Sequence, residues 1–152
     1  MDIKKMKKLD FRITEGREGI AAAYNIIRSY GSFNMDSPFF DGDDRFSVIA
    51  SLNEKDVGFW DGMIGGEDVP FDFGVGGPFF YSKMIYVLED FRREGFGSQI
   101  KYNQLEFAKS VGCESLYCRV EKSAHRDSLS IQKRLGARVR RGGGEYFECC
   151  FN

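Results

Sequence analysis

The segment FRREGFGSQI, residues 91–100, contains two arginines, two glycines and a serine between an apolar segment and a helix-like one. Backbone N–H groups at the start of a helix have no partner within the helix and carry the positive end of its dipole. Glycine lets a phosphate group approach these N–H groups closely, and Arg92 and Arg93 add positive charge. The segment therefore predicts an anion-binding site at a helix start.

Three phosphate-binding patterns could account for this segment. The dinucleotide pattern requires a third glycine where the chain has Ile100, and the nucleoside triphosphate loop requires Gly-Lys-Ser/Thr, which is absent. The remaining pattern is Arg-x-x-Gly-x-Gly, which is present as Arg92, Gly95 and Gly97 and is followed by Ser98. A glycine-rich helix start that serves packing alone stays open as the alternative.

Strand-like and helix-like patterns alternate around residues 91–100. The strand-like segments are 10–14, 45–53, 57–65, 82–88, 115–120 and a final hairpin of 137–141 and 145–151. The helix-like segments are 15–31, 97–112 and 124–135. Residues 54–56 are predicted to form a hairpin turn, and residues 32–44 and 66–80 to be irregular. In the helix over 97–112, the apolar side contains Ile100, Leu105, Ala108 and Val111.

Length and charge limit the class of protein. A chain of 152 residues can bury one continuous core, so we expect a single domain over residues 1–152. A formal net charge of −1 argues against general affinity for nucleic acids or membranes. The charge is uneven, because residues 1–80 contain 9 Lys and Arg against 14 Asp and Glu, whereas residues 81–152 contain 13 against 9. The phosphate-type pattern lies in the basic half.

The sequence shows no signal for membrane insertion or secretion. There is no run of 18 apolar residues, and the lysines near the N-terminus are followed by no apolar core or cleavage site. The cysteines have neither a zinc-site spacing nor the density of a disulfide scaffold; they are Cys113, Cys118, Cys149 and Cys150. We therefore expect reduced thiols, no bound metal and a cytoplasmic protein.

The pattern and its context resemble the GNAT superfamily of N-acetyltransferases. Val87 lies five residues before Arg92, where the family has an apolar residue at the end of its fourth strand. The segment IQKRLGA, residues 131–137, is similar to the end of the family's fourth helix. The resemblance implies an α/β (α+β) fold, with a mixed, mainly antiparallel sheet of about seven strands and about four flanking helices. It also implies that strands four and five separate.

The resemblance implies acetyl-CoA, and hence coenzyme A, as the cofactor. Its pyrophosphate would bind the backbone N–H groups of residues 93–98, and its pantetheine arm would pair with the strand around residues 84–87. The N–H of Val87 would polarise the thioester carbonyl. The implied cofactor-binding residues are Ile85, Tyr86, Val87, Arg92, Arg93, Glu94, Gly95, Phe96, Gly97, Ser98, His125, Ser128 and Gln132.

Proton transfer is where the chain departs from the family pattern. The family often has a tyrosine that protonates the departing thiolate at the position of Gln132, and an amide is not a useful acid. Ser128, Tyr117 or water could replace it. Glu121 and Glu89, which follow predicted strands, are candidates for the base, although either could be a solvated strand-end charge. The sole histidine, His125, could act as a base or contact the cofactor.

The predicted acceptor region combines acidic and aromatic residues. Family members bind the acceptor near the first helix and the loops beyond strand four, where this chain has Phe39, Phe40, Asp41 and Asp72. Carboxylates and rings together suit a cationic amine such as an amino sugar, a polyamine or a lysine side chain. Acidic residues that only keep the loops soluble are the alternative.

The leading functional prediction is an acetyl-CoA-dependent N-acetyltransferase that acts on a primary amine by direct attack. A catalytically impaired acyl-CoA-binding or protein-interaction module is the first alternative, because Gln132 replaces the usual tyrosine. A toxin that acetylates aminoacyl-tRNA is the second, suggested by the basic residues Lys133, Arg134, Arg138, Arg140 and Arg141. The final strand could also pair across a homodimer.

Overall fold

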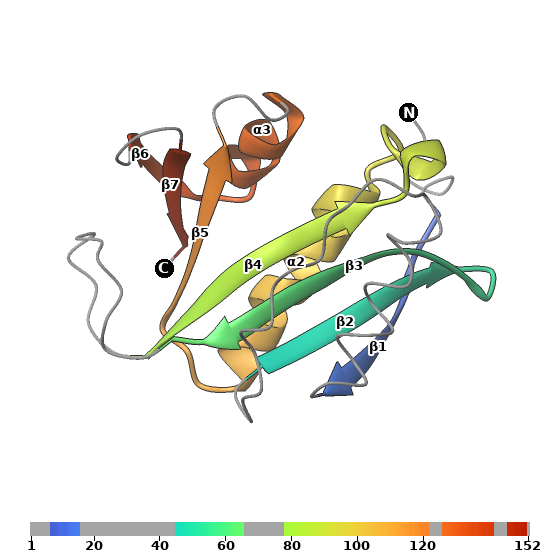
Figure 1. Cartoon of the computed structure of the whole chain (residues 1–152), viewed down its shortest axis with the longest axis horizontal. Coiled ribbons are helices and arrows are strands. Elements are labelled where there is room, and N and C mark those ends of the chain that lie inside the picture. The colour runs from blue at the N-terminus through green and yellow to red at the C-terminus, as the bar shows by residue number, and fades with distance from the viewer. Residues whose placement is uncertain (1–6, 16–44, 66–77, 122–125, 142–145, 152) are drawn as a thin grey trace, which may run out of the picture. The chain divides into compact units, whose positions relative to one another are not determined.

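The computed structural model describes residues 7–15, 45–65, 78–121, 126–141 and 146–151 (Figure 1). The elements are β1 (Asp10–Glu15), β2 (Arg45–Leu52), β3 (Lys55–Ile64), β4 (Phe79–Val87), the 3-10 helix η2 (Glu89–Phe91), α2 (Phe96–Ser110), β5 (Ser115–Glu121), α3 (Arg126–Arg134), β6 (Arg138–Arg141) and β7 (Tyr146–Phe151). The predicted helix over 15–31, the predicted loop over 32–44 and most of the irregular segment over 66–80 lie outside the described residues.

The strands form one seven-stranded sheet in the order β1-β2-β3-β4-β5-β7-β6 (Figure 1). The pairs β1–β2, β5–β7 and β6–β7 are antiparallel, and β4–β5 is parallel. This confirms the predicted mixed, mainly antiparallel sheet, and β4 is its middle strand. Within the described residues, no helix combines the length and the apolar character needed to cross a membrane.

The parallel pairing of β4 with β5 is short. It runs from Phe79 opposite Ser115 to Ser82 opposite Cys118. Both strands continue past this register, β4 to Val87 and β5 to Glu121. The pairing thus uses only the first part of each strand, as expected for two strands that separate.

The chain forms two compact units, each with its own buried residues. One comprises Met1–Asp61 with Ile85–Ile100, and the other Gly62–Met84 with Lys101–Asn152. The first buries Val48, Ile49, Ala50, Val57, Phe59, Trp60, Leu88, Phe96 and Ile100. The second buries Phe80, Ala108, Leu116, Tyr117, Cys118, Val120, Cys149, Cys150 and Phe151. The single domain over residues 1–152 stays a prediction.

The turn between β2 and β3 is shorter than predicted. Asn53 and Glu54 have positive φ angles of 50° and 70°, which is the backbone of a two-residue hairpin turn. The predicted turn over residues 54–56 is therefore wrong in its bounds, because Lys55 and Asp56 already belong to β3 and the turn is Asn53–Glu54. Asn53 tolerates the left-handed conformation, which the sequence prediction did not use.

The fourth strand begins at Phe79, three residues before its predicted start at Ser82. The Gly65 N–H donates a hydrogen bond to the Phe79 carbonyl oxygen at 2.9 Å, which extends regular pairing to this residue. Phe80 is buried, and its ring meets the Phe107 ring edge-on at a centroid distance of 5.9 Å. The aromatic pair Phe79–Phe80 thus favours a strand despite the preceding glycines and proline.

Helix α2 buries Ile100 and Ala108 of the predicted apolar side, and it also buries two polar residues. Its buried residues are Phe96, Ile100, Lys101, Gln104 and Ala108. Val111, predicted on the apolar side, follows the helix and is 37% exposed. The sequence prediction placed only apolar residues on the buried side, which is normally correct. In this helix Lys101 and Gln104 are buried as well.

Gly58 of β3 lies where no side chain can fit. A Cβ atom on Gly58 would overlap the Tyr86 carbonyl oxygen and lie 3.0 Å from Cδ1 of Ile100. We expect Gly58→Ala to lower the free energy of unfolding by about 2–3 kcal/mol, because the backbone of β4 must shift. The matched control is Gly112→Ala, since an added Cβ there meets nothing within 4 Å and only the φ of +87° opposes it.

The control should cost about 1 kcal/mol, the penalty for a left-handed alanine. Chemical denaturation of both variants measures the difference. Equal losses in the two variants would contradict the steric role of Gly58.

Candidate functional site

The predicted phosphate-binding segment has an unusual backbone. Helix η2 ends where the Arg92 N–H donates to the Glu89 carbonyl oxygen at 3.2 Å. Arg93 then has a φ of 66° and Gly95 a φ of 81°, both left-handed, and α2 begins at Phe96. A non-glycine residue in this conformation is uncommon and disfavoured by about 1–2 kcal/mol. The segment therefore holds a strained turn directly before a helix.

The amides that follow this turn are suited to an anion. The first hydrogen bond at the start of α2 runs from the Gln99 N–H to the Gly95 carbonyl oxygen at 3.3 Å. The N–H groups of Phe96, Gly97 and Ser98 precede that bond, so they have no partner within the helix. Successive N–H groups beside a left-handed residue form an anion-binding concavity. Residues 92–95 are exposed, so the turn is open to a ligand.

The start of α2 is firmly anchored. Phe96 and Ile100 are buried, at 1% and 0% exposure. The Gln99 side chain accepts a hydrogen bond from the Leu9 N–H at 3.1 Å and donates one to the Lys7 carbonyl oxygen at 2.8 Å. These contacts fix the N-terminal end of α2 before any ligand binds, and a site held in place in this way binds with less loss of entropy.

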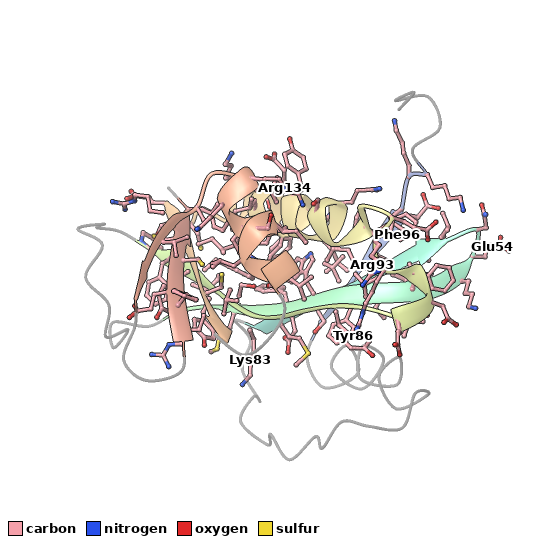
Figure 2. All side chains as sticks on the ribbon, turned by 90° about the horizontal axis from the view of Figure 1, so that it is seen from above. Glu54, Lys83, Tyr86, Arg93, Phe96 and Arg134 are labelled. Atoms are coloured by element: carbon pink, nitrogen blue, oxygen red, sulfur yellow. The ribbon has the colours of Figure 1, made fainter. Side chains whose placement is uncertain are left out.

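Arg92 braces the end of β4. Its Nε donates a hydrogen bond to the Val87 carbonyl oxygen at 2.8 Å, and its guanidinium lies 5.5 Å from the centre of the Tyr86 ring. Figure 2 labels Tyr86 together with Arg93 and Phe96 of the following turn. The Leu88 N–H donates to the Val57 carbonyl oxygen at 2.8 Å, which ties the same strand end to β3. The Arg92 side chain is thus committed to the strand that should hold the pantetheine arm.

We expect Arg92→Met to weaken the binding of acetyl-CoA, the predicted cofactor, by about threefold to tenfold, the equivalent of one hydrogen bond. Methionine keeps an apolar stem near Tyr86 but cannot donate to the Val87 carbonyl oxygen. The control is Arg93→Met, which removes the same charge one residue later without removing that bond. Calorimetric titration of both variants separates the two effects. A larger loss in the Arg93 variant would show that charge, rather than the brace, matters.

The remaining predicted site residues are spread over four elements. Ile85, Tyr86 and Val87 are half-buried on β4, and Glu89 is exposed on η2. Glu121 is the last residue of β5. On α3, Ser128 is half-buried and Gln132 is buried. His125 and the predicted acceptor residues Phe39, Phe40, Asp41 and Asp72 lie outside the described residues.

Gln132, at the position of the usual family tyrosine, points to β5. Its side chain is 5% exposed, and its Oε1 accepts a hydrogen bond from the Cys118 thiol at 3.7 Å. The amide oxygen is thus engaged inside the second unit. This observation supports the sequence argument that Gln132 does not replace the tyrosine as an acid.

Tyr117 of β5, an alternative proton donor, belongs to a polar network that joins β5 to β7. Its hydroxyl donates to Glu148 Oε2 at 3.0 Å and accepts from Arg119 Nε at 3.1 Å. Burial raises the pKa of Tyr117 to about 12. The hydroxyl therefore keeps its proton at neutral pH, and Glu148 accepts a hydrogen bond from it.

The sequence did not predict the roles of two charged residues, Glu148, which accepts a hydrogen bond from Tyr117, and Lys101, which is buried. The alternation in β7 places Glu148 and Cys150 on one face, but only the register of β5 with β7 brings Glu148 opposite Arg119. No sequence signal marks Lys101 as buried, because lysine is almost never fully buried. Among the described residues, no group of three or more His, Cys, Asp or Glu side chains could hold a metal ion.

A mixed sheet with an anion-accepting helix start after its fourth strand is the architecture of an acyl-CoA-dependent transferase. The family model described as "Acetyltransferase (GNAT) family" matches residues 11–137. The chain therefore belongs to the GNAT acetyltransferase family. The predicted class of enzyme is confirmed at this level.

Solved structures share the fold at low sequence identity. NAA60 of Arabidopsis thaliana in complex with acetyl-CoA is 19% identical, with a TM-score of 0.68 over 95% of this chain and 98% of that chain. An aminoglycoside acetyltransferase from an uncultured soil metagenomic sample, in complex with sisomicin, is 12% identical, with a TM-score of 0.66 over 95% and 96%.

A putative GNAT acetyltransferase from Desulfovibrio desulfuricans is also 12% identical, with a TM-score of 0.69 over 95% of this chain and 99% of that chain. A search of curated protein sequences found no significant match. At these identities the solved structures establish the fold and leave the acceptor open.

Proposed function

We propose that the protein transfers an acetyl group from acetyl-CoA to a primary amine by direct attack of that amine. The acceptor is a small cationic amine, a protein lysine or a protein N-terminus. The observation that carries the proposal is the start of α2, where left-handed Arg93 and Gly95 precede amides with no helical partner. Bound acetyl-CoA would supply an activated thioester, and the N–H groups of residues 93–98 would bind its pyrophosphate.

The end of β4 has the second role in this proposal. The N–H of Val87 would polarise the acyl carbonyl, and Arg92 Nε hydrogen-bonds the carbonyl oxygen of the same residue. Residues Ile85 and Tyr86 would pair with the extended arm of the cofactor. The interactions that fix this strand end therefore also fix the oxyanion donor.

For proton transfer, we propose Glu121 or Glu89 as the base that accepts the amine proton and Ser128 as a donor to the leaving thiolate. A thiol has a pKa near ~8.5, so its departure needs little acid assistance. Phe39, Phe40, Asp41 and Asp72 are proposed to attract the ammonium form of the acceptor. Neighbours of this fold were solved with the bisubstrate analogue CoA-Ac-MVNAL and with sisomicin, so the fold alone does not select among amines.

A second function has one specific observation in its favour. Because Gln132 is an amide buried against Cys118, it supplies no acid in place of the family tyrosine, and a protein that binds acyl-CoA with little turnover would tolerate that loss. Release of CoA in the presence of amines separates the two functions.

The test is calorimetric titration with acetyl-CoA, ATP and NAD, followed by an amine screen with a free-thiol readout. We expect binding of acetyl-CoA alone and thiol release with at least one amine class. Binding without release by any amine would favour the second function. Absence of acetyl-CoA binding by the folded protein would overturn both.

A further inference from the structure

Two thiols and a lysine form a buried cluster in the second unit, and Cys118 of this cluster also contacts Gln132 of the predicted cofactor-binding set. Cys118 of β5 lies directly opposite Cys149 of β7 in the antiparallel register. Directly opposite residues point to the same face of a sheet. Lys101 of α2 is 0% exposed, and its Nζ hydrogen-bonds Gln104 Oε1 at 3.1 Å and lies 5.0 Å from the centre of the Phe151 ring.

The lysine has no carboxylate to balance its charge within the described part of the chain. The titratable groups that act on it are Cys118 and Cys149, and the Cys118 sulfur is within hydrogen-bonding range of both Lys101 and the Cys149 thiol. A buried ammonium requires a counter-ion or loses its proton. A Cys118 thiolate, formed when the thiol loses the proton that it donates to Gln132 Oε1, is the counter-ion that the cluster offers.

The two thiols differ in acidity. The hydrogen bond from Cys149 and the charge of Lys101 lower the pKa of Cys118 to about 6, in spite of burial. The hydrogen bond to Cys118 and burial raise the pKa of Cys149. Cys118 is therefore the nucleophile of the pair, and Cys149 retains its proton.

We propose that Cys118 and Cys149 form a peroxide-reactive dithiol that closes into a disulfide between β5 and β7. The Cα atoms of directly opposite antiparallel residues are about 4.5–5.5 Å apart, within the about 4.4–6.8 Å that disulfides span. All four cysteines are free in the described structure, which corresponds to the reduced state. The strands need no shift in register to form this bond.

The oxidation balances with groups that the cluster contains and with hydrogen peroxide as the oxidant. The Cys118 thiolate attacks one peroxide oxygen, the O–O bond breaks, and the departing hydroxide takes a proton from Lys101 to become water. The Cys149 thiol then attacks the sulfenic acid at Cys118, and a second water leaves as the S–S bond forms. Two thiol sulfurs are oxidised and one peroxide is reduced. Lys101 ends neutral, which suits its buried position once the thiolate is lost.

The other two cysteines act as internal references. Cys150 follows Cys149 along β7, so it points to the opposite face of the sheet. Cys113 lies outside the strands, and burial raises the pKa of its thiol. Neither should react before the Cys118–Cys149 pair.

The test is treatment of the folded chain with hydrogen peroxide, alkylation of the remaining thiols and peptide mapping without reduction. We expect a linked peptide that contains Cys118 and Cys149, loss of two of the four free thiols, and recovery of both with a dithiol reductant. In Cys149→Ser, a sulfenic acid reagent should label Cys118, whereas Cys150→Ser should form the linked peptide as the unaltered chain does. Labelling of Cys113 or Cys150 ahead of Cys118, or oxidation without the linked peptide, would overturn the proposal.

Lys101→Met tests the role of the lysine. Loss of the ammonium raises the pKa of Cys118 and lowers the fraction of thiolate at neutral pH, and the greater nucleophilicity of a less acidic thiolate offsets part of this. We therefore expect oxidation to be slower by about threefold to fivefold. If the variant does not fold, the ultraviolet absorbance of the unaltered chain at neutral pH shows whether a thiolate is present. Unchanged oxidation in a folded variant, or no thiolate absorbance, would remove Lys101 from the proposal and leave an ordinary buried thiol pair.

Discussion

The free energy of unfolding is expected to rise by about 2–4 kcal/mol as the pH increases from 6 to 9. The source is Cys118, whose pKa falls from the ordinary 9.0 to about 6 in the folded protein. Between these values the unfolded chain binds a proton at Cys118 and the folded chain does not, so stability increases with pH. Each pKa unit corresponds to about 1.4 kcal/mol, which sets the upper end of the range.

The groups around Cys118 determine where this rise begins and ends. Burial lowers the pKa of Lys101, which adds a change of the same sign at higher pH. The raised pKa of Cys149 has the opposite effect above about pH 9, since the unfolded thiol then loses a proton that the folded one keeps. Tyr117, whose pKa is about 12 in the folded protein, also lowers the free energy of unfolding above pH 10, because only the unfolded chain then loses the phenol proton. Maximal stability is thus expected near pH 9.

Urea denaturation at a series of pH values measures this dependence. Cys118→Ala should abolish most of the rise between pH 6 and 9, because it removes the titrating group. Cys150→Ala is the matched control, since Cys150 is also buried and leaves a similar cavity on the other face of β7. A Cys118 variant that keeps the full pH dependence would contradict the assignment.

The second large effect concerns the start of α2. We expect Gly97→Trp to weaken acetyl-CoA binding at least about a hundredfold, because an indole over the amides of Phe96–Ser98 occupies the space of the pyrophosphate. Gly97 is half-buried and lies within the first turn of the helix. Replacing a helical glycine does not by itself destabilise the helix, so the folded state should persist.

Tyr102→Trp is the control for added bulk on the same helix. Tyr102 is 58% exposed, and a larger ring there should leave acetyl-CoA affinity unchanged. Circular dichroism establishes that both variants fold, and calorimetry compares their affinities. If Gly97→Trp binds acetyl-CoA as tightly as the unaltered chain, the pyrophosphate does not bind at the start of α2, and the proposed cofactor site is wrong.

Local patterns explain which parts of the fold the sequence predicted. The turn before α2 needs Gly95 in a left-handed conformation, and Arg-x-x-Gly-x-Gly is a local pattern that reports it directly. The central strand is likewise visible as an apolar run. The short turn at Asn53–Glu54 was within reach, because an asparagine that begins a two-residue turn is a known signal for positive φ.

Register and burial are not local, and the sequence did not predict them. The opposition of Cys118 and Cys149 depends on β7 pairing with β5 instead of extending the sheet beyond β6. The burial of Lys101 depends on what faces α2, since an isolated helix with this sequence would expose that lysine. The cluster of these three residues therefore required the structure.

The placement of β7 between β5 and β6 also determines when the sheet can be completed during biosynthesis. The ribosome makes β5 and β6 before β7, so the edge of β5 that β7 will cover stays unpaired while residues 122–151 are translated. At about 5–20 residues per second this interval lasts about 1.5–6 s. During it, an apolar strand edge and the sulfur of Cys118 are open to other nascent chains and to oxidants. Strand β7, which is synthesised after the other six strands of this sheet, therefore covers the edge that carries the thiol proposed to be the more reactive one.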